Sequence, residues 1–202
     1  RHRIHQAHAL HRHGELFPGL ESLRQAVTAL QDHALLLVPE SSRRTDWATT
    51  QNNLCIALQT LGARTGGGAG MEMLGKAVVA CEAALRVRTE TDMPVDWAII
   101  QHNLGIALQT LGSRAGGEAG WEVQKKSVAA FEAALRVRTK ASMPIYWAMT
   151  QNGLGNALRL LGESAVGEAG MAVLHRAVNA HEAALQVYTR TDTPADWAGA
   201  QN

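Results

Sequence analysis

The sequence contains no apolar stretch long enough to cross a membrane. A membrane-spanning helix needs about 18 or more consecutive apolar residues, and the strongest apolar run, residues 34–38, is far shorter. No apolar core follows the basic residues 1–5, so they do not resemble a signal peptide. The chain also lacks an initiating Met and stops within a fresh copy of a repeated motif. We therefore expect a piece of a longer protein, without membrane contact.

The sequence also has almost no excess of one charge and only two cysteines. The formal net charge is only +1, which gives no indication of a nucleic acid or a membrane surface as partner. The sequence is 46% hydrophobic and 18% charged, which is typical of a soluble folded protein and argues against disorder. The two cysteines, Cys55 and Cys81, provide no disulfide framework. We expect buried free thiols in a reducing, cytoplasmic compartment, with a Cys55–Cys81 bridge as the less favoured alternative.

What the sequence does have is a repeat with a period of 50 residues. The pair Trp-Ala recurs at residues 47, 97, 147 and 197, and Gln-x-x-Leu, Ala-Leu and Leu-Gly follow each of the first three pairs. A fixed period of this size indicates a stacked repeat array. We divide the chain into a divergent partial unit (1–46), three full units (47–96, 97–146 and 147–196) and the start of another (197–202).

Each unit is predicted to form two helices and no strand. The first, helix A, begins at Pro94 in the second full unit, because proline suits the first helical position. One face of helix A carries residues spaced by 4, 3, 4 and 3, namely Trp97, Gln101, Leu104, Leu108 and Leu111. Gly112 is expected to end this helix. The glycine-rich stretch 112–120 then makes the turn, and helix B runs from about Glu118 to Thr139.

These motifs resemble the tetratricopeptide repeat (TPR). The residues that carry the resemblance are Asn103-Leu104-Gly105, Leu108 and Leu111-Gly112 on helix A, and Ser127, Phe131, Ala134 and Pro144 on and after helix B. The family's usual unit has about 34 residues, so the surplus is expected to lengthen the turn between the helices and the link to the next unit. The resemblance implies an all-α fold: a right-handed α-solenoid of antiparallel helix pairs, with helix A lining the concave side.

Two recurring side chains at the start of helix A are interpreted as structural. A Trp stands at the same place in each full unit, and we expect it to fill the joint between units rather than form a row for ligand stacking; these are Trp47, Trp97 and Trp147. A Gln follows four residues later on the same stripe, and we expect a ladder of side-chain hydrogen bonds between units; these are Gln51, Gln101 and Gln151.

The resemblance also implies that helix A residues outside the packing stripe face the concave groove. We select seven of them as candidate peptide-binding residues: Asn52, Gln59, His102, Gln109, Asn152, Asn156 and Arg159. No carboxylate occurs among the helix A positions assigned to this face in the full units, which favours an acidic or amide-rich peptide. The alternative is that these residues are ordinary solvated positions. Arg86 and Arg88 of helix B are expected on the opposite, convex side.

Catalytic and metal-binding residues are not expected. The histidines near the start could chelate a metal only in pairs, because a spacing of three drifts around a helix and no Cys or carboxylate completes a site; they are His2, His5, His8, His11 and His13. The full units offer no nucleophile with its base and no paired carboxylates. We therefore predict neither enzyme activity nor a cofactor.

The favoured function is a protein–protein interaction scaffold, a segment of a larger signalling or regulatory protein, by analogy of fold alone. The first alternative is a self-assembly module that stacks end to end through exposed solenoid ends. The second is an RNA-binding helical repeat, which is disfavoured because no basic stripe with aromatic residues runs along helix A.

Overall fold

The computed structural model describes residues 20–35, 44–165, 167–189 and 193–201. Within these residues the regular structure is entirely helical and no strand is present, which confirms the all-α class. The elements are α2 (Glu21–Leu35), α3 (Arg44–Arg64), α4 (Gly67–Leu85), α5 (Pro94–Ala115), α6 (Gly117–Leu135), α7 (Pro144–Glu163), α8 (Gly167–Leu185) and α9 (Pro194–Gln201). The histidines at positions 2–13 lie outside the described residues.

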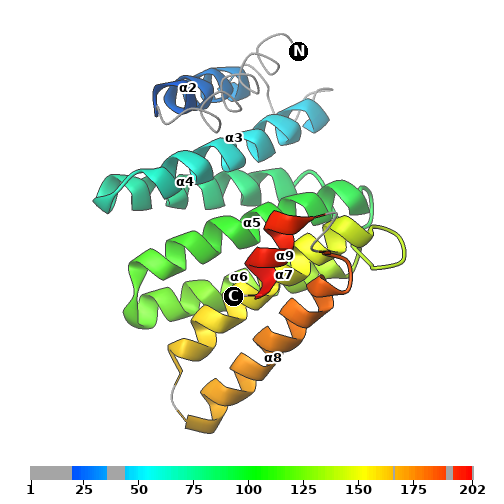
Figure 1. Ribbon diagram of the computed structural model, residues 1–202. Helices are drawn as coiled ribbons and strands as arrows, with labels where there is room; N and C mark the ends of the chain where they lie inside the picture. Colours follow the sequence, from blue (N-terminus) through cyan, green and yellow to red (C-terminus); the bar gives the residue numbers. More distant parts are fainter. Residues whose placement is uncertain (1–19, 36–43, 166, 190–192, 202) are drawn as a thin grey trace.

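The helices are stacked in pairs, in the order of the sequence (Figure 1). Short turns join α3 to α4, α5 to α6 and α7 to α8, and the two helices of each pair pack extensively on one another. The pairs are held together because α4 contacts α5, and α6 contacts α7. In addition, α3 touches α5 and α5 touches α7. Each helix thus packs mainly on its neighbours in the sequence, as in a repeat array.

The turn between the paired helices is much shorter than predicted. Helix α5 continues to Ala115, so Gly112 does not end it. Gly112 is buried, and a Cβ built there would lie 3.0 Å from Nε2 of Gln124 on α6; its role is to allow close approach of the two helices. The chain turns at Gly116, whose φ of 63° lies in the left-handed region that favours glycine.

The surplus residues of the 50-residue unit therefore lie in long helices and in the link between units, which is formed by residues 136–143 between α6 and α7. In the second full unit, α5 has 22 residues and α6 has 19. Helix α6 ends at Leu135 rather than near Thr139. The expectation of an enlarged turn between the two helices was wrong, because most of the glycine-rich stretch is itself helical.

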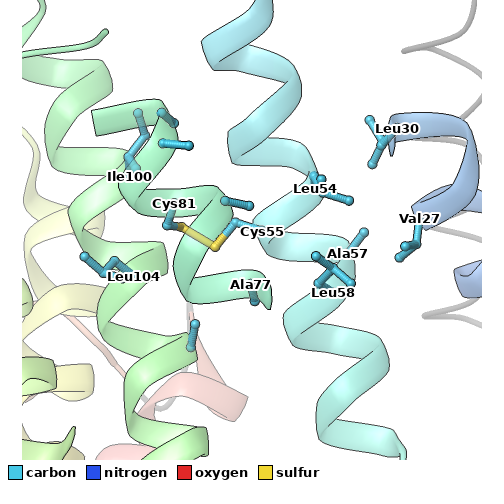
Figure 2. Close-up of a cluster of buried hydrophobic side chains, with 14 of the residues drawn as sticks. Val27, Leu30, Leu54, Cys55, Ala57, Leu58, Ala77, Cys81, Ile100 and Leu104 are labelled. Atoms are coloured by element: carbon cyan, nitrogen blue, oxygen red, sulfur yellow. A yellow bond between two sulfur atoms is a disulfide. The ribbon is translucent and has the colours of Figure 1, made fainter. Parts of the chain in front are cut away.

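The two cysteines form a disulfide that links α3 to α4 (Figure 2). The Cα atoms of Cys55 and Cys81 are 5.4 Å apart, and both side chains are fully buried. The prediction of free thiols is therefore wrong, and the inference of a reducing compartment, which rested on it, loses its basis.

The physical reason for the disulfide lies in the equivalent positions of the other units. In the second pair, a Cβ built on Gly105 would lie 2.8 Å from the ring of Phe131. In the third pair, a Cβ built on Gly155 would lie 2.6 Å from the ring of His181. In both, a ring occupies the space opposite a glycine. Cysteine replaces both partners in the first pair, and the two sulfur atoms fill that space.

Trp97 lies where α4, α5 and α6 meet. Its side chain is only 7% exposed and belongs to a buried cluster with alanines of α5 and α6. Leu85 at the end of α4 packs against the same cluster. The guanidinium of Arg136 lies 5.0 Å from the centre of the indole ring. Trp47 is similarly buried and Trp147 is half-buried.

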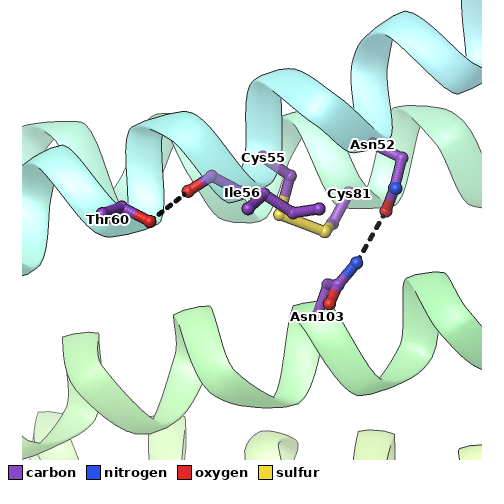
Figure 3. The surroundings of a disulfide bond; sticks show 6 residues. All are labelled: Asn52, Cys55, Ile56, Thr60, Cys81 and Asn103. Carbon is purple, nitrogen blue, oxygen red and sulfur yellow. Dashed lines mark hydrogen bonds between the residues drawn. A yellow bond between two sulfur atoms is a disulfide. The ribbon is translucent and has the colours of Figure 1, made fainter. Parts of the chain in front are cut away.

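The recurring glutamines do not form the predicted ladder. Gln51, Gln101 and Gln151 are half-buried, and in the part of the chain that the structure describes no side-chain hydrogen bond joins them to another unit. A side-chain hydrogen bond between α3 and α5 instead joins two asparagines close to these glutamines: Nδ2 of Asn103 donates to Oδ1 of Asn52 at 3.0 Å (Figure 3).

Candidate functional site

The predicted groove residues lie on α3, α5 and α7, but they do not converge on one site. Six of the seven are half-buried: Asn52, Gln59, Gln109, Asn152, Asn156 and Arg159. Asn152 is engaged by its own helix pair, since its Oδ1 lies 3.0 Å from Nδ1 of His181. Arg159 forms an exposed ion pair with Glu163, to whose Oε1 it donates at 2.6 Å. Asn52 lines a cavity between α3 and α5, and Arg159 lines a separate pocket formed by α7, α8 and α9.

His102 differs from the other six because its side chain is buried. It is 6% exposed, and its ring packs edge-on against Phe131 with 5.5 Å between the ring centres. Nδ1 lies 3.2 Å from Oγ1 of Thr150 on α7. Burial, together with the positive charge of Arg138, lowers the pKa of His102 to about 3. His102 is therefore a neutral interior residue, and its predicted place on the open groove is corrected.

A small cavity lies between the first halves of α3 and α5, with an arginine at its wall. We call it the Arg88 pocket. Its volume is about 140 Å³ and its lining residues are Thr49, Asn52, Arg88, Asp96, Ile99 and Ile100. The lining combines two aliphatic side chains with an amide, a hydroxyl and an ion pair. The arginine reaches the pocket from the turn that follows α4, where its backbone N–H donates to the carbonyl of Ala84 at 3.0 Å.

Both terminal nitrogens of the Arg88 guanidinium are held by protein groups. The guanidinium forms an ion pair with the carboxylate of Asp96, in the first turn of α5. It also donates to the hydroxyl of Thr49 and to the backbone carbonyl of Thr45. The third nitrogen, Nε, is buried and has no acceptor among the described protein atoms. A buried donor without a partner costs about 1–3 kcal/mol.

The position of Arg88 corrects the prediction that it lies on the convex side. Its side chain is only 12% exposed, in contrast to the exposed Arg86 two residues earlier. The sequence carries a signal for this arrangement, because Arg88 and Arg138 recur 50 residues apart in register with the apolar stripe of helix B. A long cationic side chain on that stripe packs its aliphatic part in the interior and places its charged group in a polar environment.

In the next pair, larger side chains fill the equivalent space. Arg138 occupies the place of Arg88, and it is 4% exposed. Its Nη1 donates to Oγ1 of Thr150 at 2.9 Å, and its guanidinium lies 5.4 Å from the ring centre of Tyr146. Burial lowers the pKa of Arg138 to about 10. His102 and Tyr146 occupy the positions that Asn52 and Asp96 occupy in the first pair. Their rings fill the space that, in the first pair, is the Arg88 pocket.

A scan of the sequence against protein-family models finds no match, and a search of curated proteins finds no relative. No helix among the described residues combines the length and the apolar character needed to pass through a bilayer.

Proposed function

We propose that the chain is a protein-interaction scaffold, a TPR-like right-handed solenoid that binds a peptide or partner helix along the concave surface of α3, α5 and α7. The Arg88 pocket is the observation that carries this proposal. It offers a buried guanidinium N–H without an acceptor beside a cavity between two A helices. An arginine only donates, so the matching ligand atom is an oxygen of a carboxylate or a carboxamide.

The size of the pocket supports a side-chain anchor rather than a whole small molecule. A water molecule takes about 30 Å³ of liquid volume, so a cavity of about 140 Å³ has room for one carboxylate or carboxamide with its methylene. The two aliphatic walls, Ile99 and Ile100, suit that methylene. We therefore propose that an Asp, Glu, Asn or Gln side chain of the partner enters the pocket.

We propose that the partner's other contacts involve residues that follow the pocket along α3 and α5. Ile56 and Ile106 are half-buried, and Gln59 and Gln109 lie three residues after them. These alternating apolar and amide positions suit the side chains that flank the anchor. The preference for an acidic or amide-rich partner rests on the Nε–H of Arg88, which has no acceptor although the guanidinium is paired with Asp96. His102 is buried and Arg159 is paired with Glu163.

A variant that closes the pocket tests the proposal. Asn52→His, Asp96→Tyr and Ile100→Thr together give the first pair the side chains that the second pair has at these positions, which the same fold already accommodates. Binding is measured by screening a displayed peptide library against the natural chain and titrating the selected peptides by fluorescence anisotropy. We expect selection of peptides with a shared acidic or amide residue, and at least a tenfold loss of affinity in the triple variant.

The control is Arg86→Gln, which removes an exposed arginine from the outer side of the same segment and should leave affinity unchanged. Circular dichroism and the melting temperature show that both variants are folded. The proposal fails if the selected peptides bind the triple variant as tightly as the natural chain. It also fails if affinity is lost on changing Arg86, because the outer surface is then the functional one.

A further inference from the structure

Arg114 connects the second helix pair to the end of the first. It lies in the last turn of α5, and its Nη1 donates to the carbonyls of Gly62 and Thr65 at 2.7 Å each. Its Nη2 donates to the carbonyl of Ala63. Carbonyls at the end of a helix have no partner within it, and their partial negative charge favours a cation. A planar guanidinium therefore serves three acceptors at the end of α3.

At the same place between the next two pairs there is no arginine. The repeat puts Ser164 where the previous unit has Arg114. Ser164 is exposed, and its hydroxyl donates to the carbonyl of Leu160 at 2.9 Å, in its own helix pair. A Cβ built on Gly70 would lie 2.5 Å from Nη1 of Arg114, whereas the three atoms nearest to one built on Gly120 all belong to the backbone. The start of α6 therefore lacks the guanidinium that contacts the start of α4.

An open pocket of about 610 Å³ lies at this place, and we call it the Ser164 pocket. The carbonyls of Gly112, Ser113 and Ala115, at the end of α5, correspond by the repeat to the three that accept the arginine at the end of α3. No side chain of a described residue donates to them. They lie against the start of α6, since a Cβ built on Gly120 would be 2.6 Å from the oxygen of Gly112. The pocket is lined by Gly117, Glu118 and Trp121 of α6, by Ser164 and Ala165 after α7, and by Ala169 of α8.

We propose that the Ser164 pocket binds the guanidinium of an arginine side chain presented by another polypeptide. The three carbonyls at the end of α5 accept its N–H groups in the way that the end of α3 accepts those of Arg114. The carboxylate of Glu118 adds a negative charge at the wall, where the first unit has Gly68. Glu118 forms no ion pair with a described residue, so it can pair with an incoming cation. This site is independent of the Arg88 pocket, which lies at the opposite end of α5.

Trp121 provides a wall for the aliphatic part of the arginine. Its equivalents in the other units are Met71 and Met171, and only the indole offers an aromatic face on which a guanidinium stacks. Nζ of Lys125 lies 4.2 Å from the ring centre and pairs with Glu122 at 2.9 Å. The indole thus already contacts one cation, and the part of the ring that lines the pocket remains open to the ligand.

The tripeptide acetyl-Ala-Arg-Ala-amide is the probe and the full chain is the receptor. Binding is followed by the chemical shifts of backbone amides in two-dimensional NMR. We expect saturable shifts at residues 113–121, with a Kd on the order of 1 mM. The same peptide with lysine should bind at least fivefold more weakly, because an ammonium does not present a planar fork to three acceptors. The peptide with citrulline, which has a similar shape without the charge, should not bind.

Variants of the chain locate the site. Ser164→Arg gives the third pair the side chain that the second pair already carries at this place, and it should weaken binding at least tenfold by filling the pocket. Ser164→Ala removes only the hydroxyl and should bind the arginine peptide normally. Glu118→Gln should weaken binding several-fold, whereas Glu168→Gln, at the same position of α8 and outside the pocket, should have no effect. Circular dichroism shows that each variant is folded, as expected for changes at exposed positions.

The proposal is overturned if the arginine peptide does not bind, or if the citrulline peptide binds as tightly. It is equally overturned if the Ser164→Arg variant binds the arginine peptide normally, or if the shifts lie at the Arg88 pocket instead of residues 113–121. Self-association in light scattering that Ser164→Arg abolishes also overturns it, because the arginine then comes from a second copy of the chain.

Discussion

Acidification should destabilise the protein through His102, and Asn at this position should remove most of that effect. In the unfolded chain a histidine takes up its proton near pH 6.5. In the folded protein, burial and the neighbouring Arg138 lower the pKa of His102 to about 3. Between these two values the unfolded state binds more protons than the folded state. The free energy of unfolding therefore falls as the pH decreases from about 6.5 towards about 3.

The size of the effect follows from the gap between the two pKa values. Within the window, each pH unit lowers the free energy of unfolding by up to about 1.4 kcal/mol. Between pH 7 and pH 5 the contribution of this one side chain is about 2 kcal/mol. Urea denaturation followed by circular dichroism at pH 7, 6 and 5 measures it. His102→Asn is the matched variant, because Asn occupies the same position in the other two full units (Asn52 and Asn152).

We compare how steeply the free energy of unfolding falls with pH in the natural chain and in the His102→Asn variant. The difference between the two is the contribution of His102 alone. A smaller slope should persist in the variant, because burial and Arg159 also lower the pKa of His181. His175 is exposed, and His175→Asn is the control for replacing a histidine by asparagine at a surface position. Equal losses of stability between pH 7 and pH 5 in the natural chain and in His102→Asn would refute the reasoning.

Two further perturbations test the packing of the array. Trp97→Ala should lower the free energy of unfolding by about 3–5 kcal/mol, because it empties a buried joint between two units; a loss below about 1 kcal/mol in urea denaturation would contradict this. Reduction of the Cys55–Cys81 disulfide, which joins residues separated by 26 positions, should cost about 3 kcal/mol. A variant with alanine at both cysteines should melt at the same temperature with and without reductant, and a reductant effect on that variant would sink the assignment.

The sequence alone predicted the helical class and the position of the helix starts, because both depend on local patterns. Pro94 and Pro144 stand at the first residues of α5 and α7, as expected from their fixed φ. The helix ends were predicted less well. Gly112 carries the local signal of a stop, yet the close approach of α6 gives a different reason for glycine at that position. A one-dimensional pattern does not distinguish these two uses of the residue.

The sequence analysis missed the disulfide because neither cysteine indicates it alone. The indication comes from comparing both positions together with their equivalents in the other units. Each Cys, taken singly, is an isolated departure from the repeat. Taken together, the positions pair glycine with Phe131 in one unit, glycine with His181 in another, and cysteine with cysteine in the first. Reading the repeat as coupled positions would have shown that, among the three full units, the one without the glycine is also the one without the ring.

The candidate site could be placed on the A helices from the sequence, but its decisive residue could not. Surface positions were chosen from helix A, whereas Arg88 reaches the site from the segment after α4. The same coupling of positions also explains why units of one architecture differ in the space beside their arginine. Asn52 and Asp96 leave a cavity beside Arg88, while His102 and Tyr146 fill the same place beside Arg138. In an array whose framework is formed by repeated Trp, Leu and Gly, the proposed binding site lies at a few interior positions where the units differ. The pocket-closing variant tests this view directly, because it changes three such positions and leaves the framework as it is.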